Sequence, residues 1–379
     1  MPANPDVYWL ALRQVRGVGP RTCRLLLEKF GSPERIFHLN EDEIASAGVP
    51  RQVARNIREF SNFDPLEREL CELPRIGARL LRWTDDDYPP HLRHIADPPP
   101  YLFVRGDAQL SDPRCIAVVG ARAASEAGRR MAQRLGLELA AKGFVVVSGL
   151  ARGIDAEAHQ GALDAGGRTF AVMGCGVDVI YPAEHRKLAE AILANGGALL
   201  SELPIGTQPL AENFPTRNRI LSGISLGVVV VEAAEKSGSL ITARMALEQN
   251  RQVFAVPGSP VGGKTRGSNR LLKEGAKLVE CVEDVIEEIA PQLGIKLGPA
   301  PGSARTPKEK SMTSSANAAP DISNESKTVL NYFRAGEKLH IDAIIENSGL
   351  NPQTVLRILL DLELRGLVAQ YPGKLFSLT

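Results

Sequence analysis

Hydrophobic and polar positions follow one regular pattern between about residues 115 and 290. Short runs of β-branched residues alternate there with segments whose apolar positions recur at helical spacing. Several runs are apolar throughout, without the alternation of a half-exposed strand, which is typical of parallel strands covered by helices on both faces. The pattern predicts an α/β domain with a doubly wound, mostly parallel sheet. The runs are CIAVV, FVVVS, TFAVM, ALLSE, GVVVVEA, QVFAV and KLV.

The pattern before this sheet predicts a smaller helical domain. Residues 1–83 show helical periods and no strand pattern, and RGVGPR at residues 16–21 joins two of these helices as a tight, glycine-rich hairpin. We therefore predict a helical, helix-hairpin-helix (SAM-like) domain over residues 1–83. Residues 84–295 are predicted to form the Rossmann-like sheet domain, with TDDDYPPHLRHIADPPPYLFVRGD as an irregular lead-in.

The last part of the chain separates into a linker and a compact module. Of the 25 residues from 300 to 324, 18 are Ala, Gly, Ser, Thr, Pro or Asn, so residues 296–324 are predicted to be a flexible linker. Two helical patterns, the turn SGLN, a long helix and two short strands around YPGK predict a winged helix-turn-helix over residues 325–379. This module holds six basic and six acidic residues, so both duplex DNA and a protein remain candidate partners for it.

Composition narrows the class of protein without naming a partner. The chain has 379 residues, with 45 Lys and Arg against 44 Asp and Glu, so net charge alone predicts no polyanionic partner. No apolar run approaches the ~18 residues of a membrane span, and the first residues lack the pattern of a secretory signal, so we expect a cytoplasmic protein. The five cysteines are scattered and odd in number, which argues against a disulfide framework, a metal site or a redox cofactor.

Several loops of the predicted sheet contain residue types that bind phosphate. Gly120–Ser125 follows the strand CIAVV and contains Arg122, and Ser148–Asp155 follows FVVV. Both lie where a strand's carboxyl end leads into a helix, the edge at which doubly wound sheets bind ligands with backbone amides and helix dipoles. Each Ser could merely cap a helix, with Ser125 and Ser239 as N-caps, but the joint occurrence with arginines favours phosphate binding. The other loops of this edge are Ser201-Glu202, Phe214–Arg219 and Ser237–Ser239.

Two kinds of nucleotide site match this fold less well. A dinucleotide site needs GxGxxG and an acid at the end of the second strand, whereas this chain has GARAASEAG and Ser148-Gly149 there. Residues 258–265, GSPVGGKT, match the P-loop pattern of nucleotide triphosphatases. However, Pro260 removes one amide, and RGSN after Lys264 is expected to interrupt the helix that such a site requires. The segment from Ser259 to Lys273 remains a basic loop without an acid, suited to tracking a nucleic-acid backbone.

Two smaller motifs each have two interpretations. Asp155 and His159 stand four residues apart in GIDAEAH and could share a helix face as a metal or acid–base pair. No third ligand is near in sequence, so an acid at a helix N-terminus above a packed or hydrogen-bonded histidine is the favoured interpretation. In the N-terminal hairpin, residues 7–27 contain four arginines and no acid, so this hairpin is either a DNA contact or a structural spacer.

The motifs between residues 116 and 279 resemble, in order, those of the DNA-processing protein A (DprA/Smf) family. They are AVVGARAASEAG, VVSGLARGIDAEAHQGAL, GGRTFAVMGCGVDVIYP, LLSELPIG, FPTRNRILSGIS, VVVVEAAEKSGSLITARMALEQNRQVFAVPG and GSNRLLKEGAKLV. The resemblance implies a Rossmann-like domain that binds single-stranded DNA, without enzymatic activity, cofactor or metal. It further implies a role in natural transformation and recombination, with protection of incoming strands, loading of RecA recombinase and a homodimer formed through the Rossmann-like domain.

The loops and the resemblance together give a set of DNA-binding residues. Strand-end amides and arginines would hold the phosphates, and bases would stack on Phe214. The candidate residues are Arg122, Ser148, Gly149, Phe214, Arg217, Asn218, Arg219, Ser237, Gly238, Lys264 and Asn269.

An enzyme of similar fold is the alternative function. The LOG or lysine-decarboxylase-like phosphoribohydrolases, which act on nucleoside monophosphates, have a PGGxGTxxE signature with a catalytic Glu on the helix after the loop. This chain has SGSLITAR at residues 237–244, without a Glu at that place. Release of adenine from AMP would support this alternative.

Overall fold

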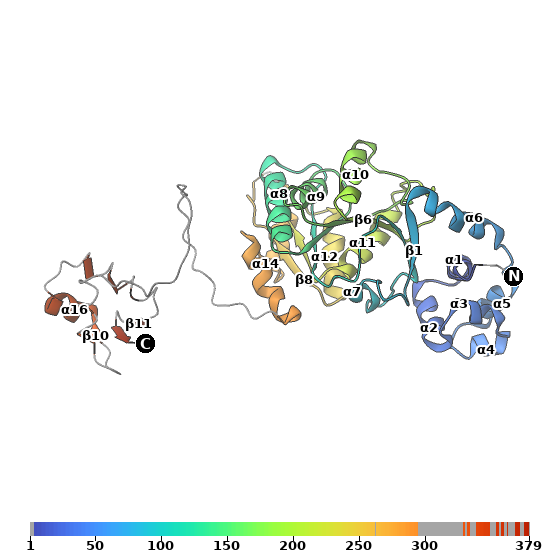
Figure 1. The fold of residues 1–379 in the computed structure, drawn as a ribbon, viewed down its shortest axis with the longest axis horizontal. Helices are drawn as coiled ribbons and strands as arrows, with labels where there is room; N and C mark the ends of the chain where they lie inside the picture. Colours follow the sequence, from blue (N-terminus) through green and yellow to red (C-terminus); the bar gives the residue numbers. More distant parts are fainter. Residues whose placement is uncertain are drawn as a thin grey trace, which may run out of the picture. The chain divides into compact units, whose positions relative to one another are not determined.

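The computed structural model divides the chain into two units, Met1–Ala300 and Pro301–Thr379. Figure 1 shows the elements of both. The residues that the structure describes are 4–261, 263–294, 329, 332–333, 339–348, 354–355, 358–359, 362, 368–371 and 375–378. The predicted linker, residues 296–324, lies outside these ranges.

Short helices around their own apolar core begin the first unit, as the periodicity of this region predicts (Figure 1). Leu26, Ile36 and Ile57 are fully buried in this core. Gly17 has a φ of +89° in the hairpin between the first two helices, a conformation that glycine adopts readily. The helices are α1 (Asp6–Gln14), α2 (Pro20–Phe30), α3 (Pro33–His38), α4 (Glu41–Ala45), α5 (Arg51–Glu59) and α6 (Asp64–Glu72), followed by the 3₁₀ turn η1 (Pro74–Ile76).

A nine-stranded sheet forms the centre of the first unit, in the order β1-β2-β6-β5-β4-β3-β7-β8-β9. The strands from β3 to β9 are parallel to one another. The chain adds β4, β5 and β6 on one side of β3 and then β7, β8 and β9 on the other, so the strand order reverses at β3. At such a switch point the loops at the carboxyl ends diverge and leave a crevice. The parallel strands are β3 (Cys115–Val119), β4 (Val145–Ser148), β5 (Thr169–Val172), β6 (Ala198–Ser201), β7 (Gly227–Val230), β8 (Gln252–Ala255) and β9 (Lys277–Leu278).

Two antiparallel strands extend this sheet where none was expected. β1 (Ala78–Arg82) lies within the region predicted to be helical, and β2 (Tyr101–Arg105) within the predicted irregular lead-in. β1 pairs with β2, and β2 pairs with β6. The prediction was wrong here because β1 is a half-buried edge strand that ends in arginine, so its apolar pattern is weak.

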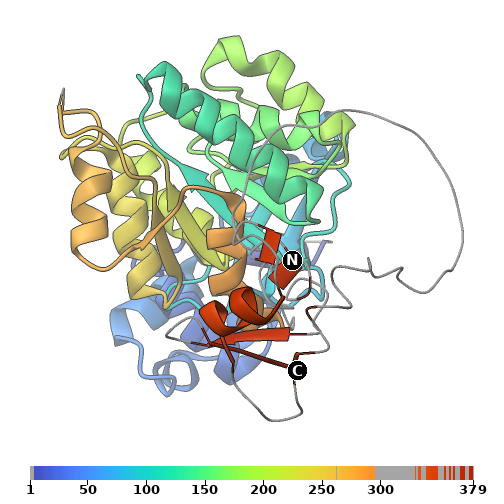
Figure 2. The same ribbon diagram turned by 90° about the vertical axis from the view of Figure 1, so that its left-hand side faces the viewer.

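Helices cover both faces of the sheet, as its apolar strands predict (Figure 2). One face packs against α8 (Glu126–Ala141), α9 (Ile154–Asp164), α10 (Arg186–Ala194) and α14 (Val282–Ile289). The other face packs against α7 (Pro90–Arg93), α11 (Asn213–Ile224), α12 (Gly238–Glu248) and α13 (Arg266–Lys273). Within the ranges that the structure describes, no helix is long and apolar enough to cross a membrane.

The second unit has a small sheet and a separate core. Its three strands run in the order β10-β12-β11, and β11 and β12 pair antiparallel as the hairpin of the predicted wing. Ile344, Val355 and Leu362 are fully buried in its core. The described elements are β10 (Leu339–His340), α16 (Ile341–Ser348), β11 (Val368–Tyr371) and β12 (Leu375–Leu378).

His159 is fully buried between α9 and the sheet. The Thr169 hydroxyl donates to the Val146 carbonyl at 2.7 Å, so the Nδ1–H of His159 donates to the Thr169 oxygen, also at 2.7 Å. Its Nε2 has no hydrogen-bond partner among the described residues. Burial, with His185 and Arg217 nearby, lowers the pKa of His159 from 6.5 to about 3. The packed, hydrogen-bonded histidine favoured from the sequence is therefore what the structure contains.

We predict that this histidine makes the first unit less stable in acid. Below pH 6.5 the unfolded chain binds a proton that the folded chain accepts only near pH 3, so stability is lost as pH falls through this window. The free energy of unfolding should fall by up to about 1.4 kcal/mol per pH unit from this group. Urea unfolding from pH 7.5 to 4 measures the slope. The same slope in a His159→Gln variant would contradict the assignment.

Candidate nucleic-acid interface

A cavity of about 510 Å³ opens at the carboxyl ends of the parallel strands, beside the switch point at β3. The loop after β3 contributes Arg122, the loop after β5 contributes Tyr181, and the first turns of α11 contribute Phe214, Arg217 and Asn218. Ser237, Gly238 and Ser239, where α12 begins, complete this side. Six of the predicted DNA-binding residues therefore line one cavity, as expected for loops at the same edge of a sheet.

Phe214 is the centre of an aromatic and cationic cluster in this cavity. Its half-buried ring lies 5.8 Å from the Tyr181 ring, and the Arg122 guanidinium carbon lies 5.2 Å from its centroid. A Cβ at Gly174 would come within 2.8 Å of the Phe214 ring, so a glycine at this position is what leaves room for the ring. Arg122 is exposed and has no ion pair with any described residue. A partly exposed aromatic ring with an unpaired guanidinium over it is an arrangement that suits a nucleobase and a phosphate.

Arg217 is buried, and its guanidinium joins the ends of two strands. Its Nη1 donates to the Gly149 carbonyl at 3.1 Å and to the Val172 carbonyl. A Cβ at Gly149 would lie 2.5 Å from this guanidinium, so the glycine allows the approach. Burial lowers the pKa of Arg217, and the nearby Asp155 carboxyl opposes that effect. Arg217 therefore contributes positive charge to the cavity wall while it fixes the loop after β4.

Asp155 is a buried acid in the wall of the same cavity. Its carboxylate accepts a hydrogen bond from the Gly149 amide at 3.1 Å. Burial raises the pKa of Asp155, while Arg217 lowers it. No group of three or more metal-ligating side chains occurs in the described part of the chain, around Asp155 and His159 or elsewhere.

Three predicted residues have side chains that are engaged within the protein. The Ser148 hydroxyl is fully buried and donates to the Val118 carbonyl at 2.7 Å. Arg219 is buried, pairs with Glu202 and donates to the Asp97 carbonyl at 2.9 Å. The Asn269 side chain bonds both the amide and the carbonyl of Gly258, at 3.0 and 2.8 Å. None of these three side chains lines the cavity.

The structure corrects how two loops were interpreted. Phe214–Arg219, predicted to be a strand-end loop, lies in helix α11, and residues two apart on a helix point in different directions. This explains why Arg217 lines the cavity and Arg219 does not. At α12 the N-cap is Ser237, not Ser239, and its hydroxyl accepts the Ser239 amide at 3.4 Å. Ser125 is confirmed as the N-cap of α8.

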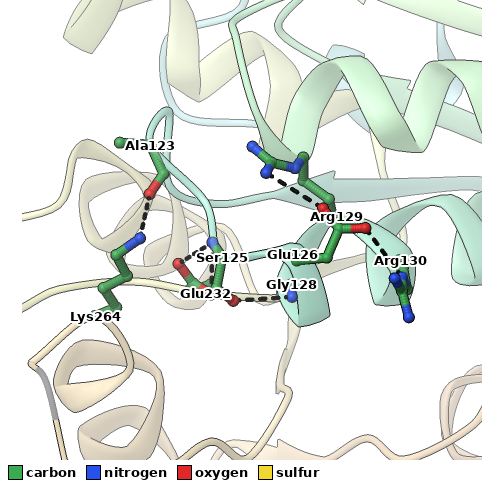
Figure 3. A network of polar contacts seen from close by, with 8 residues as sticks. All are labelled: Ala123, Ser125, Glu126, Gly128, Arg129, Arg130, Glu232 and Lys264. Atoms are coloured by element: carbon green, nitrogen blue, oxygen red, sulfur yellow. Dashed lines mark hydrogen bonds and ion pairs between the residues drawn. The ribbon is translucent and has the colours of Figure 1, made fainter.

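The Arg122 loop is held at three points by residues that follow β7 and β8, and Figure 3 shows the contacts at Ala123 and Ser125. The Glu232 carbonyl accepts the Ala121 amide at 2.7 Å, and the Glu232 carboxylate accepts the Ser125 amide at 3.0 Å and the Ser125 hydroxyl. The Lys264 ammonium donates to the Ala123 carbonyl at 3.1 Å. Figure 3 shows Lys264 pointing at Ala123 of this loop, and Glu232 beside Ser125, whose hydroxyl accepts the Gly128 amide. Both residues therefore shape the loop that presents Arg122.

One of the two sequence arguments against a P-loop does not hold in the structure. Helix α13 begins at Arg266, directly after the matched segment, so RGSN does not interrupt it. That expectation was wrong. The Lys264 ammonium nevertheless lies against the Ala123 carbonyl.

Sequence reasoning missed Tyr181 and Arg152 as residues of this edge. Tyr181 lines the cavity, and both lie around a smaller adjoining hollow with Arg122 and Phe214. Arg152 stands in the loop Ser148–Asp155, which was singled out as a whole. For Tyr181 the sequence offers one signal, an aromatic residue soon after the end of a predicted strand.

Comparison with known proteins identifies the family. Residues 79–290 match the family model for DNA recombination-mediator protein A. The chain belongs to this family. Residues 313–374 match the DprA winged helix domain, and residues 10–62 match a SAM-like helix-hairpin-helix tandem, which confirms the kind of each predicted flanking domain. The winged-helix match begins within the predicted linker.

Individual members of the family cover most of this chain. Protein Smf of Escherichia coli is 39% identical over 89% of this chain and 87% of its own length. The X-ray structure of DNA processing protein A (DprA) from Streptococcus pneumoniae has 36% identity and a TM-score of 0.66, over 76% of this chain and 99% of that one. DNA processing protein A from Helicobacter pylori, with 30% identity and a TM-score of 0.52 over 57% and 97%, is described as having a unique single-stranded DNA binding mode.

We predict that Glu232 keeps the Arg122 loop in place. In Glu232→Gln the amide nitrogen cannot accept hydrogen bonds from Ser125, so one acceptor of a buried, charge-assisted cluster is lost. The free energy of unfolding should fall by about 1.5 to 3 kcal/mol. Amide hydrogen exchange at residues 121–125 should become faster.

Ser125→Ala is the comparison variant, because it removes one hydrogen bond to Glu232 and the N-cap of α8 but leaves the Ser125 amide bonded to Glu232. Its effect on amide exchange should be smaller. Unchanged exchange at residues 121–125 in Glu232→Gln would show that Glu232 does not hold the loop.

Proposed function

We propose that this protein binds single-stranded DNA in the cavity at the carboxyl edge of its sheet. The observation that carries the proposal is the exposed, unpaired Arg122 beside the half-buried Phe214 ring. A base would stack on Phe214, and the flanking phosphates would contact Arg122, Asn218 and the amides at the start of α12. Arg217 would act through its charge and by holding the cavity wall.

The shape of the cavity favours single strands over duplex DNA. Bases in a duplex are stacked on each other and cannot reach a ring inside a cavity, whereas an unpaired base can turn into it. The related protein from Helicobacter pylori, with its single-stranded DNA binding mode, supports the same choice.

We further propose that the bound strand is an intermediate of transformation or recombination. By resemblance to its family, the protein would act in the cytoplasm as a homodimer formed through the Rossmann-like domain, protect incoming strands and help to load RecA recombinase. It would do so without catalysis. The family match to a recombination mediator supports this role.

Hydrolysis of nucleoside monophosphates remains the alternative, and Asp155 is the observation that bears on it. Asp155 is the only acid among the described residues that line the cavity, and a buried acid with a raised pKa can serve as a general acid or base. Its carboxylate is bonded to the Gly149 amide within the protein. Release of adenine from AMP at an enzymatic rate would favour this alternative.

We predict selective, salt-dependent binding of single strands. Affinities for matched single- and double-stranded oligonucleotides, measured across a salt series, should favour the single strand. The logarithm of its binding constant should fall with the logarithm of salt concentration by about 0.7 per neutralised phosphate. A preference for duplex, or binding that does not depend on salt, would overturn the proposal.

We predict that Phe214 supplies stacking rather than packing alone. Phe214→Leu keeps an apolar side chain against Gly174 but has no aromatic face, so single-strand affinity should fall by about 1 to 3 kcal/mol while the melting temperature stays close to that of the wild type. Phe214→Tyr retains the ring and should bind normally. Equal affinity of the Leu and Tyr variants would assign Phe214 to the core.

A further inference from the structure

A second arginine, Arg152, stands at the edge of the smaller hollow that adjoins the cavity. This hollow is also lined by Arg122, Tyr181 and Phe214. Arg152 is exposed, and the edge of its guanidinium formed by Nε and Nη2 binds both oxygens of one carboxylate. Its Nε lies 2.6 Å from Oε1 of Glu184, and its Nη2 lies 2.7 Å from Oε2. A cation that lines the same hollow as the Phe214 ring is thus paired with an acid of the same chain.

The backbone on both sides of this ion pair is fixed. Leu150, in the same loop as Arg152, is fully buried and has a φ of +56°, a conformation that a leucine keeps only when its surroundings impose it. The His185 Nδ1, next to Glu184, donates to the Leu150 carbonyl at 2.9 Å. Gly153 packs so closely on the carbonyls of the Arg122 loop that a side chain there would collide. Only the two side chains can therefore rearrange without disturbing the fold.

The ion pair itself is weak in energy and specific in geometry. The two side chains are 59% and 54% exposed, so water screens their attraction and the ion pair adds little to stability. The planar fork of Arg binds a carboxylate or a phosphate with the same two parallel hydrogen bonds. A phosphate that reaches Arg152 can therefore replace the Glu184 carboxylate at little cost.

We propose that Arg152 is a further phosphate-binding residue of the single-strand site, and that Glu184 occupies it as an internal competitor in the free protein. The strand phosphate next to the base on Phe214 would displace the Glu184 carboxylate, which would turn into solvent. This inference rests on the proposed function, and it adds a built-in control of affinity. Free anions that bind weakly would not displace Glu184 from Arg152. A strand already stacked on Phe214 would bring its phosphate to Arg152 at high local concentration.

The test measures affinity for a labelled oligothymidylate across a salt series, with the full chain. Glu184→Gln should bind about fivefold more tightly at low salt, because Arg152 no longer has a charged partner. Arg152→Gln should bind more weakly, with a salt slope smaller by about 0.7, the value for one lost phosphate contact. In the double variant the gain from Glu184→Gln should disappear, because its only route is through Arg152.

Glu283→Gln is the matched control for charge. It removes one acid from another partly exposed ion pair, with Lys142 at the C-terminal end of α8, and should leave affinity unchanged. Equal tightening in Glu283→Gln and Glu184→Gln, or a gain from Glu184→Gln that persists without Arg152, would overturn the proposal. Melting temperatures show whether each variant folds, and Arg152→Lys, which keeps the charge but not the fork, should fold and bind between wild type and Arg152→Gln.

The outcomes separate this inference from the function on which it rests. If the wild-type protein shows no preference for single strands, the proposed function itself is wrong. If the wild-type protein binds single strands and Glu184→Gln has the same affinity, only the proposed role of Arg152 and Glu184 is wrong.

Discussion

A buried guanidinium, that of Arg217, is the interaction on which the candidate site depends. It bonds the Gly149 carbonyl at the end of β4 and the Val172 carbonyl at the end of β5, so two neighbouring strand ends share one cation. The Gly149 amide in turn bonds Asp155 at the start of α9. Breaking a buried, charged contact of this kind leaves an unsatisfied charge, which costs several kcal/mol. The loop after β4, with Arg152 near its end, therefore has a fixed backbone before any ligand arrives.

Phe214 depends on the same helix as Arg217. The two residues stand three apart on α11, which places them on one side of the helix, and the Arg217 guanidinium carbon lies 5.9 Å from the ring centroid. With Gly174 behind the ring and Arg122 beside it, the ring has little freedom. A surface that is already in its binding geometry loses less entropy when it binds a flexible strand.

The sheet could be predicted from the sequence, whereas part of the site could not. Parallel strands buried on both faces are largely apolar, so β3 to β8 stand out as apolar runs, whereas β9 is a short, exposed strand at the end of the sheet. β1 did not, because an edge strand with arginine at its end depends on pairing rather than on an apolar pattern. The loops were identified because strand ends gather at one edge. Which side chains of Phe214–Arg219 face the cavity depends on their positions around helix α11. Those positions can be predicted only when the first residue of the helix is known.

The clamp at Glu232 also bears on free nucleotides. In sheets of this type, the N-terminus of the first helix after the switch-point strand is a place where a nucleotide phosphate binds. Here that place, at the start of α8, is filled by the Glu232 carboxylate, which lies against Ser125 and leaves no room for a side chain at Gly128. A free nucleotide would have to displace a buried acid that is part of the fold. An anion brought to this position would meet the Glu232 carboxylate, and repulsion between the two negative charges disfavours a phosphate there.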